Sequence, residues 1–198
     1  MLTDHQISTL WTRMVATSPL VAQRLDIAFK DQLPTTLRKN HAYFFNISDS
    51  HDENGQQNPG THWVYFQCFD SENGPIALYF DSFGFAPFEQ LRNRVRVQFR
   101  REIGWNRRQI QNERVSGSCG WYCLALALML NRPYREGTIY KNSIIERYED
   151  FLHLFEDDTL KNDNILRKFF ILSPDDAGAE QSIPEDMGPD SRSVLYSA

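Results

Sequence analysis

A cysteine lies at the boundary between a loop of small residues and a long uncharged segment. Cys119 follows the small residues at 116–118 and precedes Gly120, and the next charged residue is Arg132. Most cysteines in apolar segments are buried structural residues. Here, however, the small neighbours leave room for a substrate backbone to approach the sulfur. The pattern therefore favours a nucleophilic thiol at the first turn of a buried helix over a structural cysteine.

A cysteine attacks a carbonyl as its thiolate. The positive end of a helix dipole lowers the pKa of a thiol, and a nearby imidazole can take its proton. Among the five histidines, only His62 begins a predicted central strand directly after a glycine-bearing loop, where its ring could face a cleft. His62 is therefore the candidate general base. The other histidines are His5, His41, His51 and His153.

A lone carboxylate follows the next predicted strand. Asp81 lies in the otherwise apolar run "LYFDSFGF", and a buried carboxylate is costly unless it is paired. Pairing with His62 on the neighbouring strand would fix the tautomer of the imidazole and stabilise its cation. Asp81 could instead cap the turn that follows it.

Acyl transfer also requires donors for the oxyanion. The backbone N–H of Cys119 is one candidate, and the side-chain amide of Gln111, eight residues earlier, is the other. Gln109 is the reserve for the amide role.

The remaining cysteines, Cys68 and Cys123, are expected to be structural. A zinc site built from Cys119, Cys123 and His62 would be the alternative use of these residues. The spacing of the two cysteines is not accompanied by a second ligand pair of the usual kind, which disfavours this reading.

The order of the predicted elements indicates an α+β fold. An amphipathic helix at 4–15 with Thr3 as its N-cap comes first, followed by a strand at 42–47 and a surface loop at 48–60. Two antiparallel strands beginning at His62 and Ile76 are joined by the turn-forming residues 71–75.

Helices dominate the second half. Pro87 is expected at the first position of a helix that runs to Phe99, and 106–113 is expected to be a short exposed strand or an extended segment. The helix at 119–131 is apolar all round, so it should lie buried against a central mixed sheet, with outer helices at 142–158 and 160–172.

Length and composition suit one domain at 1–172, followed by an acidic tail at 173–198 that we expect to be disordered. Three cysteines argue against a disulfide framework and for a reducing compartment. The longest apolar run is half of a bilayer span, and the first residues lack signal-peptide order, so we expect a protein that is soluble and not secreted.

Positive charge is concentrated between 92 and 114, although the chain has a net charge of -5. Eight arginines and two glutamates give this segment +6. Such a face is often only solvated, but it also suits a polyanion such as DNA. The candidate DNA-binding residues are Arg92, Arg96, Arg100, Arg107 and Arg108.

Four motifs occur in an order that resembles the adenovirus-type, or adenain-like, cysteine endopeptidases of viruses, virophages and virus-like transposons, which share the fold of SUMO-deconjugating proteases. These motifs are "GTHWVYF", "FDSFGF", a glutamine and "SGSCGWYCL". With "LTDHQI" and "DQLP", the likeness extends from residue 2 to residue 132. It implies a papain-like fold and a catalytic set of His62, Asp81, Gln111 and Cys119.

The resemblance also implies a function. Such enzymes cleave viral capsid and other precursor proteins during particle maturation, after small residues, in the virion and in the host cytoplasm or nucleus. Their chemistry requires no cofactor, while DNA or a peptide can act as activator. Three other functions stay open: removal of ubiquitin-like or SUMO-like modifiers, acetyl transfer, and an inactive virion or nucleic-acid-binding scaffold.

Overall fold

The computed structural model describes residues 1–17, 20, 22, 24–114, 117–132 and 143–170. The predicted acidic tail at 173–198 therefore lies outside the described residues.

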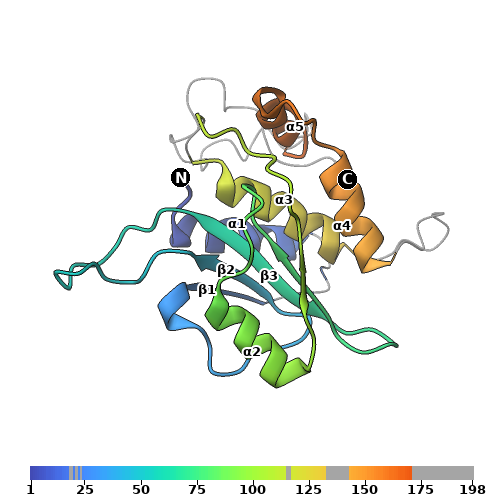
Figure 1. Cartoon of the computed structure of the whole chain (residues 1–198). Coiled ribbons are helices and arrows are strands. Elements are labelled where there is room, and N and C mark those ends of the chain that lie inside the picture. The colour runs from blue at the N-terminus through green and yellow to red at the C-terminus, as the bar shows by residue number, and fades with distance from the viewer. Residues whose placement is uncertain (18–19, 21, 23, 115–116, 133–142, 171–198) are drawn as a thin grey trace.

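The architecture is α+β, with a five-stranded mixed sheet flanked by helices (Figure 1). The strands follow one another across the sheet in chain order: β1 (Leu25–Phe29), β2 (Ala42–Asn46), β3 (Trp63–Phe69), β4 (Ile76–Phe80) and β5 (Ile103–Trp105). The two outer pairs are parallel and the two inner pairs are antiparallel. The mixed central sheet and the predicted hairpin are thus confirmed.

Helices cover both faces of this sheet. The α-helices are α1 (Asp4–Thr17), α2 (Glu89–Phe99), α3 (Cys119–Asn131), α4 (Ile144–His153) and α5 (Asn162–Lys168), with short 3-10 turns at Lys30–Gln32 and Thr159–Lys161. Residues Phe44 and Tyr65 pack in a core with α1 and α3, whereas Tyr43 and Phe66 pack in a second core with α2. Because side chains alternate between two covered faces, the central strands are apolar throughout.

The helix that begins with Cys119 is buried on nearly all sides, as its composition predicts. Its far end is tied to the sheet, because Asn131 exchanges two amide hydrogen bonds with Gln67 of β3, at 2.8 and 2.9 Å. Asn131 also accepts from the backbone N–H of Ala22 at 3.1 Å. This polar anchor holds α3 in a fixed position along β3.

The beginning of α1 also agrees with its prediction. The side-chain hydroxyl of Thr3 accepts a hydrogen bond from the N–H of Gln6, and the side-chain Oε1 of Gln6 accepts one from the N–H of Thr3. This reciprocal pair is a capping box and explains why the helix begins at Asp4.

Several sequence predictions need correction. Pro87 does not open α2, because Phe88 is extended and the helix begins at Glu89. The segment 106–113 forms no strand and is only partly exposed, since Asn106, Ile110 and Gln111 are buried. Both outer helices are shorter than predicted, and α4 ends at His153 because a turn interrupts the segment before α5.

None of the helices in the described ranges is long and apolar enough to cross a membrane.

Candidate active site

The sheet brings His62 and Asp81 together at one edge. His62 directly precedes β3 and Asp81 directly follows β4, and these two strands are antiparallel neighbours. The Nε2 atom of His62 lies 2.9 Å from Oδ1 of Asp81. Both residues are buried, with exposed fractions of 6% and 1%.

Asp81 has both of the roles considered for it. Its Oδ1 atom accepts from His62 and also from the backbone N–H of Phe83 at 2.7 Å, so the carboxylate both pairs with the imidazole and caps the following turn. The ring of Phe83 covers the imidazole, with ring centroids 4.9 Å apart. The turn therefore fixes the carboxylate while its aromatic residue shields the pair from water.

Cys119 is the first residue of α3 and lies beside His62. Its sulfur accepts from the backbone N–H of Trp63 at 3.5 Å and lies close enough to His62 to raise the pKa of the imidazole. Since Nε2 of the imidazole is directed at Asp81, Nδ1 is the ring nitrogen that remains for the sulfur.

These contacts set the charge of His62. Burial lowers its pKa, but the hydrogen bond to Asp81 and the contacts with the Cys119 sulfur outweigh burial and raise the pKa from 6.5 to about 9. The imidazolium is therefore the favoured form at neutral pH, with the Nε2–H directed at the carboxylate and the Nδ1–H on the other side of the ring.

The first turn of α3 presents backbone donors next to the sulfur. Ser118 is the N-cap residue, yet its side chain accepts no hydrogen bond from the described helix. A serine in this position usually satisfies one such N–H. The N–H groups of Cys119 and Gly120 are therefore positioned to donate to an anion that forms on a carbon bound to the sulfur.

Gln111 is buried and is held by the turn that carries Asp81. Its side-chain Oε1 accepts from the hydroxyl of Ser82 at 2.7 Å, and its backbone N–H donates to the carbonyl of Ser82 at 3.0 Å. Gln109 differs, because it is half-buried and its amide donates to the carbonyl of Gln111 at 2.9 Å. Gln111 is thus the more buried of the two candidate amides.

The other two cysteines lie in apolar surroundings. Burial raises the pKa of Cys68 to about 11 and that of Cys123 well above its ordinary value. The Cys123 thiol donates to the carbonyl of Trp63 at 3.4 Å. Within the described ranges, no group of three or more histidine, cysteine or acidic side chains is arranged to hold a metal ion.

Sequence reasoning missed a supporting residue, Asn106. Its side chain accepts from the N–H of Asp81 at 3.1 Å and donates to the Asp81 carbonyl at 2.5 Å. The hydroxyl of Tyr148 in α4 accepts from the N–H of Asn106 at 2.8 Å and donates to the carbonyl of Tyr79 at 2.6 Å. The signal in the sequence is weak, since Asn106 lies in a polar, arginine-rich segment.

The C-terminal helices support the glutamine-bearing loop. Asn162 donates to the carbonyl of Ile110 at 2.9 Å, and Arg108 donates to the carbonyls of Leu152 and Phe155. Arg108 also pairs with Asp157 at 3.3 Å. This candidate DNA-binding residue is thus engaged within the fold.

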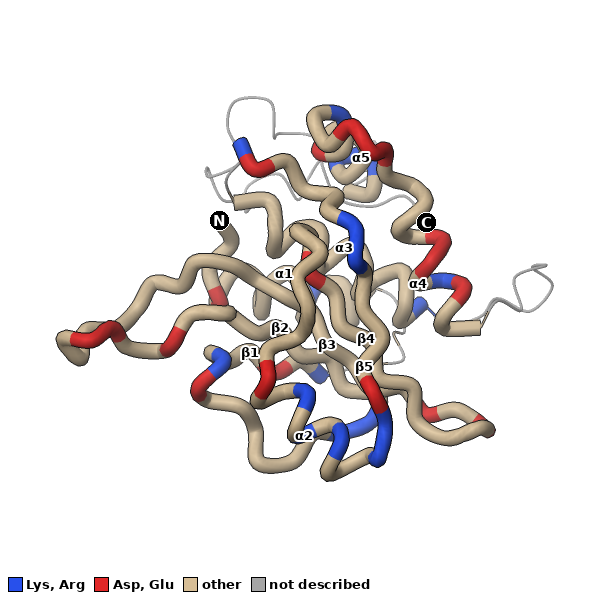
Figure 2. Tube along the Cα trace, in the orientation of Figure 1, with Lys and Arg blue, Asp and Glu red and all other residues tan. Residues whose placement is uncertain are grey.

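The other candidate DNA-binding residues lie on or near α2. Figure 2 shows basic residues gathered along α2 and the turn towards β5. Arg96 pairs with Glu102 at 3.0 Å, and the guanidinium of Arg107 lies 5.1 Å from the centre of the Trp105 ring. Arg92 and Arg100 are exposed.

A recess of about 610 Å³ lies next to Trp63. It is lined by Ile27–Phe29 of the edge strand β1, by Gln57–Pro59 and by the residues that begin α1. The indole N–H of Trp63 donates to the carbonyl of Leu2 at 2.7 Å. The recess thus adjoins the residue whose backbone N–H donates to Cys119.

Neither a protein-family model nor a curated protein matches this chain.

Proposed function

We propose that this protein is a papain-like cysteine endopeptidase. The observation that carries the proposal is the continuous chain of contacts from Asp81 through His62 to Cys119, which is the first residue of a buried helix. A thiol, an imidazole and a carboxylate in this order are the parts that a nucleophilic cysteine requires. The motif resemblance supports the same assignment.

Cys119 attacks first. It attacks as the thiolate, with its proton already held by the His62 imidazolium. The sulfur forms a bond to the carbonyl carbon of the substrate, and the electron pair of the C=O double bond moves to the oxygen, which becomes an oxyanion. The backbone N–H of Cys119 and the side-chain amide of Gln111 donate to this oxygen. Asp81 stabilises the imidazolium that holds the transferred proton.

His62 then acts in the opposite sense. It donates its proton to the leaving amine as the carbon–nitrogen bond breaks, which leaves a thioester on Cys119. A water molecule gives its proton to His62 and attacks the thioester carbon. The carbon–sulfur bond breaks, the carboxylic acid product departs, and the thiolate and imidazolium are restored.

Viral capsid or other virion precursor proteins are the proposed substrates, with activity in the virion and the host cytoplasm or nucleus. This part of the proposal depends on the motif resemblance, which also implies cleavage after small residues. The recess beside Trp63 is the proposed place for the substrate residues before the cleaved bond. No cofactor takes part in the chemistry, and DNA or a peptide is proposed as an activator.

A peptide-library cleavage assay tests the activity. The protein is incubated with a proteome-derived peptide library, and the new termini are identified by mass spectrometry. The wild type should cleave after small residues, while Cys119→Ser and His62→Ala should not. Cys123→Ala is the matched control, because it removes a buried thiol one turn along the same helix and should leave cleavage unchanged. If the Cys119→Ser variant still cleaved peptides, Cys119 would not be the nucleophile.

The same preparation separates the other functions. Hydrolysis restricted to ubiquitin-like or SUMO-like fusions would indicate a deconjugating protease, and acetylated products formed from acetyl-coenzyme A would indicate an acetyltransferase. If none of these substrates is converted and Cys119 does not react with an alkylating reagent, the protein is an inactive scaffold. Each of these results would contradict the proposed endopeptidase.

A further inference from the structure

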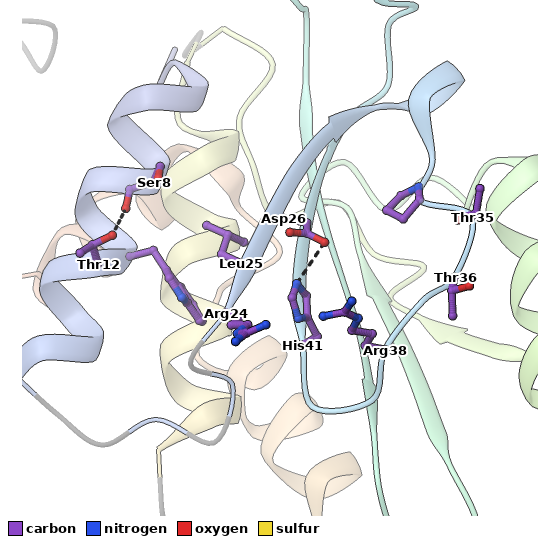
Figure 3. Close-up of a pocket in the computed structure, with 11 residues that line it drawn as sticks. Ser8, Thr12, Arg24, Leu25, Asp26, Thr35, Thr36, Arg38 and His41 are labelled. Atoms are coloured by element: carbon purple, nitrogen blue, oxygen red, sulfur yellow. Dashed lines mark hydrogen bonds and ion pairs between the residues drawn. The ribbon is translucent and has the colours of Figure 1, made fainter.

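A polar recess lies far from the candidate active site, at the other end of β2. This strand begins after His41 and ends before Ile47, whose N–H donates to the carbonyl of His62 at 3.1 Å. The recess has a volume of about 760 Å³ and lies between α1, the first residues of β1 and the loop that precedes β2 (Figure 3). It therefore shares no residue with the catalytic set.

The strand register brings basic side chains together there. Leu25 of β1 is aligned with Ala42 of the parallel strand β2, so the preceding residues Arg24 and His41 are neighbours. The N–H of Ala42 fixes this arrangement by donating to the carbonyl of Arg24 at 3.1 Å. Figure 3 shows Arg24 and Arg38 approaching the ring of His41 from opposite sides.

The two guanidinium groups have no acidic partner within the described part of the chain. Neither Arg24 nor Arg38 makes a side-chain hydrogen bond or ion pair with a described residue. Asp26 is the one carboxylate in the described lining, and it lies 3.2 Å from Nε2 of His41. Two arginines against one aspartate leave the recess positively charged even when the imidazole is neutral.

Two residues in the wall of the recess also carry buried nitrogen atoms. The indole N–H of Trp11 and the Nε2 atom of His41 have no hydrogen-bond partner among the described residues, and the two residues are only 3% and 5% exposed. The contact between His41 and Asp26 has the distance of an ion pair but not the direction of a hydrogen bond. Buried polar groups without partners are rare in folded proteins, yet both of these line the same recess.

We propose that this recess binds the phosphoryl group of a small molecule. The two guanidinium groups offer more N–H donors than the two oxygens of a carboxylate can accept, whereas a phosphoryl group has three terminal oxygens. The volume is within the range of about 300–1,000 Å³ that is usual for small-molecule sites. A phosphate ion alone would leave most of it unfilled.

Inorganic phosphate is the probe for a test by calorimetry and NMR at constant ionic strength. Wild-type protein should bind phosphate saturably, and the indole N–H resonance of Trp11, assigned with Trp11→Phe, should shift during the titration. Arg24→Gln and Arg38→Gln should each weaken binding by about tenfold, because each removes a charged donor. Arg13→Gln is the matched control, since Arg13 is exposed on α1 but does not line the recess.

Thermal unfolding without phosphate shows whether each variant is folded. Arg38 lies in a loop, outside the described helices and strands. Arg38→Gln therefore provides a second variant if Arg24→Gln is unstable. A wild type without saturable binding, an equal loss of affinity in Arg13→Gln, or an unmoved Trp11 resonance would each overturn the proposal. Active-site variants such as Cys119→Ser should bind phosphate normally, so the outcome is independent of the proposed peptidase activity.

Discussion

At the scale of single residues, the most informative side chain is His62. Burial alone would keep the imidazole neutral, yet its contacts with Asp81 and Cys119 raise its pKa to about 9. The ring therefore carries a proton at neutral pH, which suits it to protonate a leaving amine. The same shift makes the folded protein depend on pH in a defined direction.

The first prediction concerns that dependence. The folded pKa of His62 is about 9 and the unfolded value is 6.5, so its contribution to stability is fully present below pH 6.5 and is lost as the pH rises through about 9. Asp81→Asn removes the charge that raises the pKa. Between pH 6 and pH 9.5, the wild type should lose more unfolding free energy than this variant, by up to about 3 kcal/mol, because Cys119 supplies the rest of the pKa shift.

Urea unfolding at the two pH values measures this difference. Other titrating groups are common to both proteins, so their contributions cancel in the comparison. A wild type whose stability falls no more steeply than that of Asp81→Asn would show that the carboxylate does not hold the imidazolium.

The second prediction concerns Gln111. If its amide donates to the oxyanion, Gln111→Ala should lower kcat by about 10²–10³ while KM changes little. Gln109→Ala is the matched control, because this amide donates to the carbonyl of Gln111. Steady-state kinetics on the best library peptide gives both constants, and a larger effect from Gln109→Ala would reverse the assignment.

At the scale of elements, close packing at the beginning of α3 sets the position of the nucleophile. A Cβ atom at Gly120 would lie 3.2 Å from Leu2 and 3.4 Å from Trp63. Trp63 in turn donates its backbone N–H to the sulfur of Cys119. The absence of a side chain at Gly120 thus lets β3 and residues near the N-terminus approach the first turn of the helix.

The third prediction follows from this packing. Gly120→Ala should lower kcat by about tenfold, because Leu2 and Trp63 must shift by a few tenths of an ångström next to the sulfur. Gly104→Ala is the matched control, since a Cβ atom there meets Leu78 at the same 3.2 Å but on β5. If both variants lost the same activity and the same stability, the loss would come from overpacking anywhere in the fold, and the position of Gly120 next to the sulfur would not explain it.

The elements also divide into those that the sequence could predict and those that it could not. The hairpin of β3 and β4 and the helices α1 and α3 depend on local turn chemistry and periodicity, which a single sequence contains. The strands β1 and β5 were not predicted. They are short, and their stability comes from parallel pairing with β2 and β4.

The candidate site divides in the same way. Cys119, His62 and Asp81 stand out because each is an unusual residue type in its local surroundings. The burial of Gln111 and the support from Asn106 depend on contacts with Ser82 and Tyr148, which are 29 and 42 residues away along the chain. A polar segment such as 106–113 therefore appears exposed when its sequence is considered alone.

At the scale of the whole molecule, the arginine-rich surface and the candidate active site lie on different faces of the sheet. The arginine-bearing helix α2 covers one face of the sheet, and α3 with its cysteine covers the other. A polyanion bound along α2 would therefore leave the candidate active site open to a substrate.

The fourth prediction tests DNA binding at this face. Affinity for duplex DNA should fall as salt rises, and Arg92→Gln and Arg100→Gln should each reduce the slope of log K against log salt by about 1. Arg13→Gln, on the opposite face, should leave the slope unchanged. Fluorescence anisotropy at several salt concentrations measures this slope. Binding that is independent of salt would exclude contacts between these arginines and the DNA phosphates.

The most direct measurement for the whole account is alkylation of the three cysteines, followed by peptide mapping. With limiting iodoacetamide near pH 7, Cys119 should be modified first, because burial raises the pKa values of Cys68 and Cys123. His62→Ala should slow the modification of Cys119 at least tenfold without unfolding the protein. Faster modification of another cysteine, or an unchanged rate in His62→Ala, would contradict a thiolate held by this imidazole.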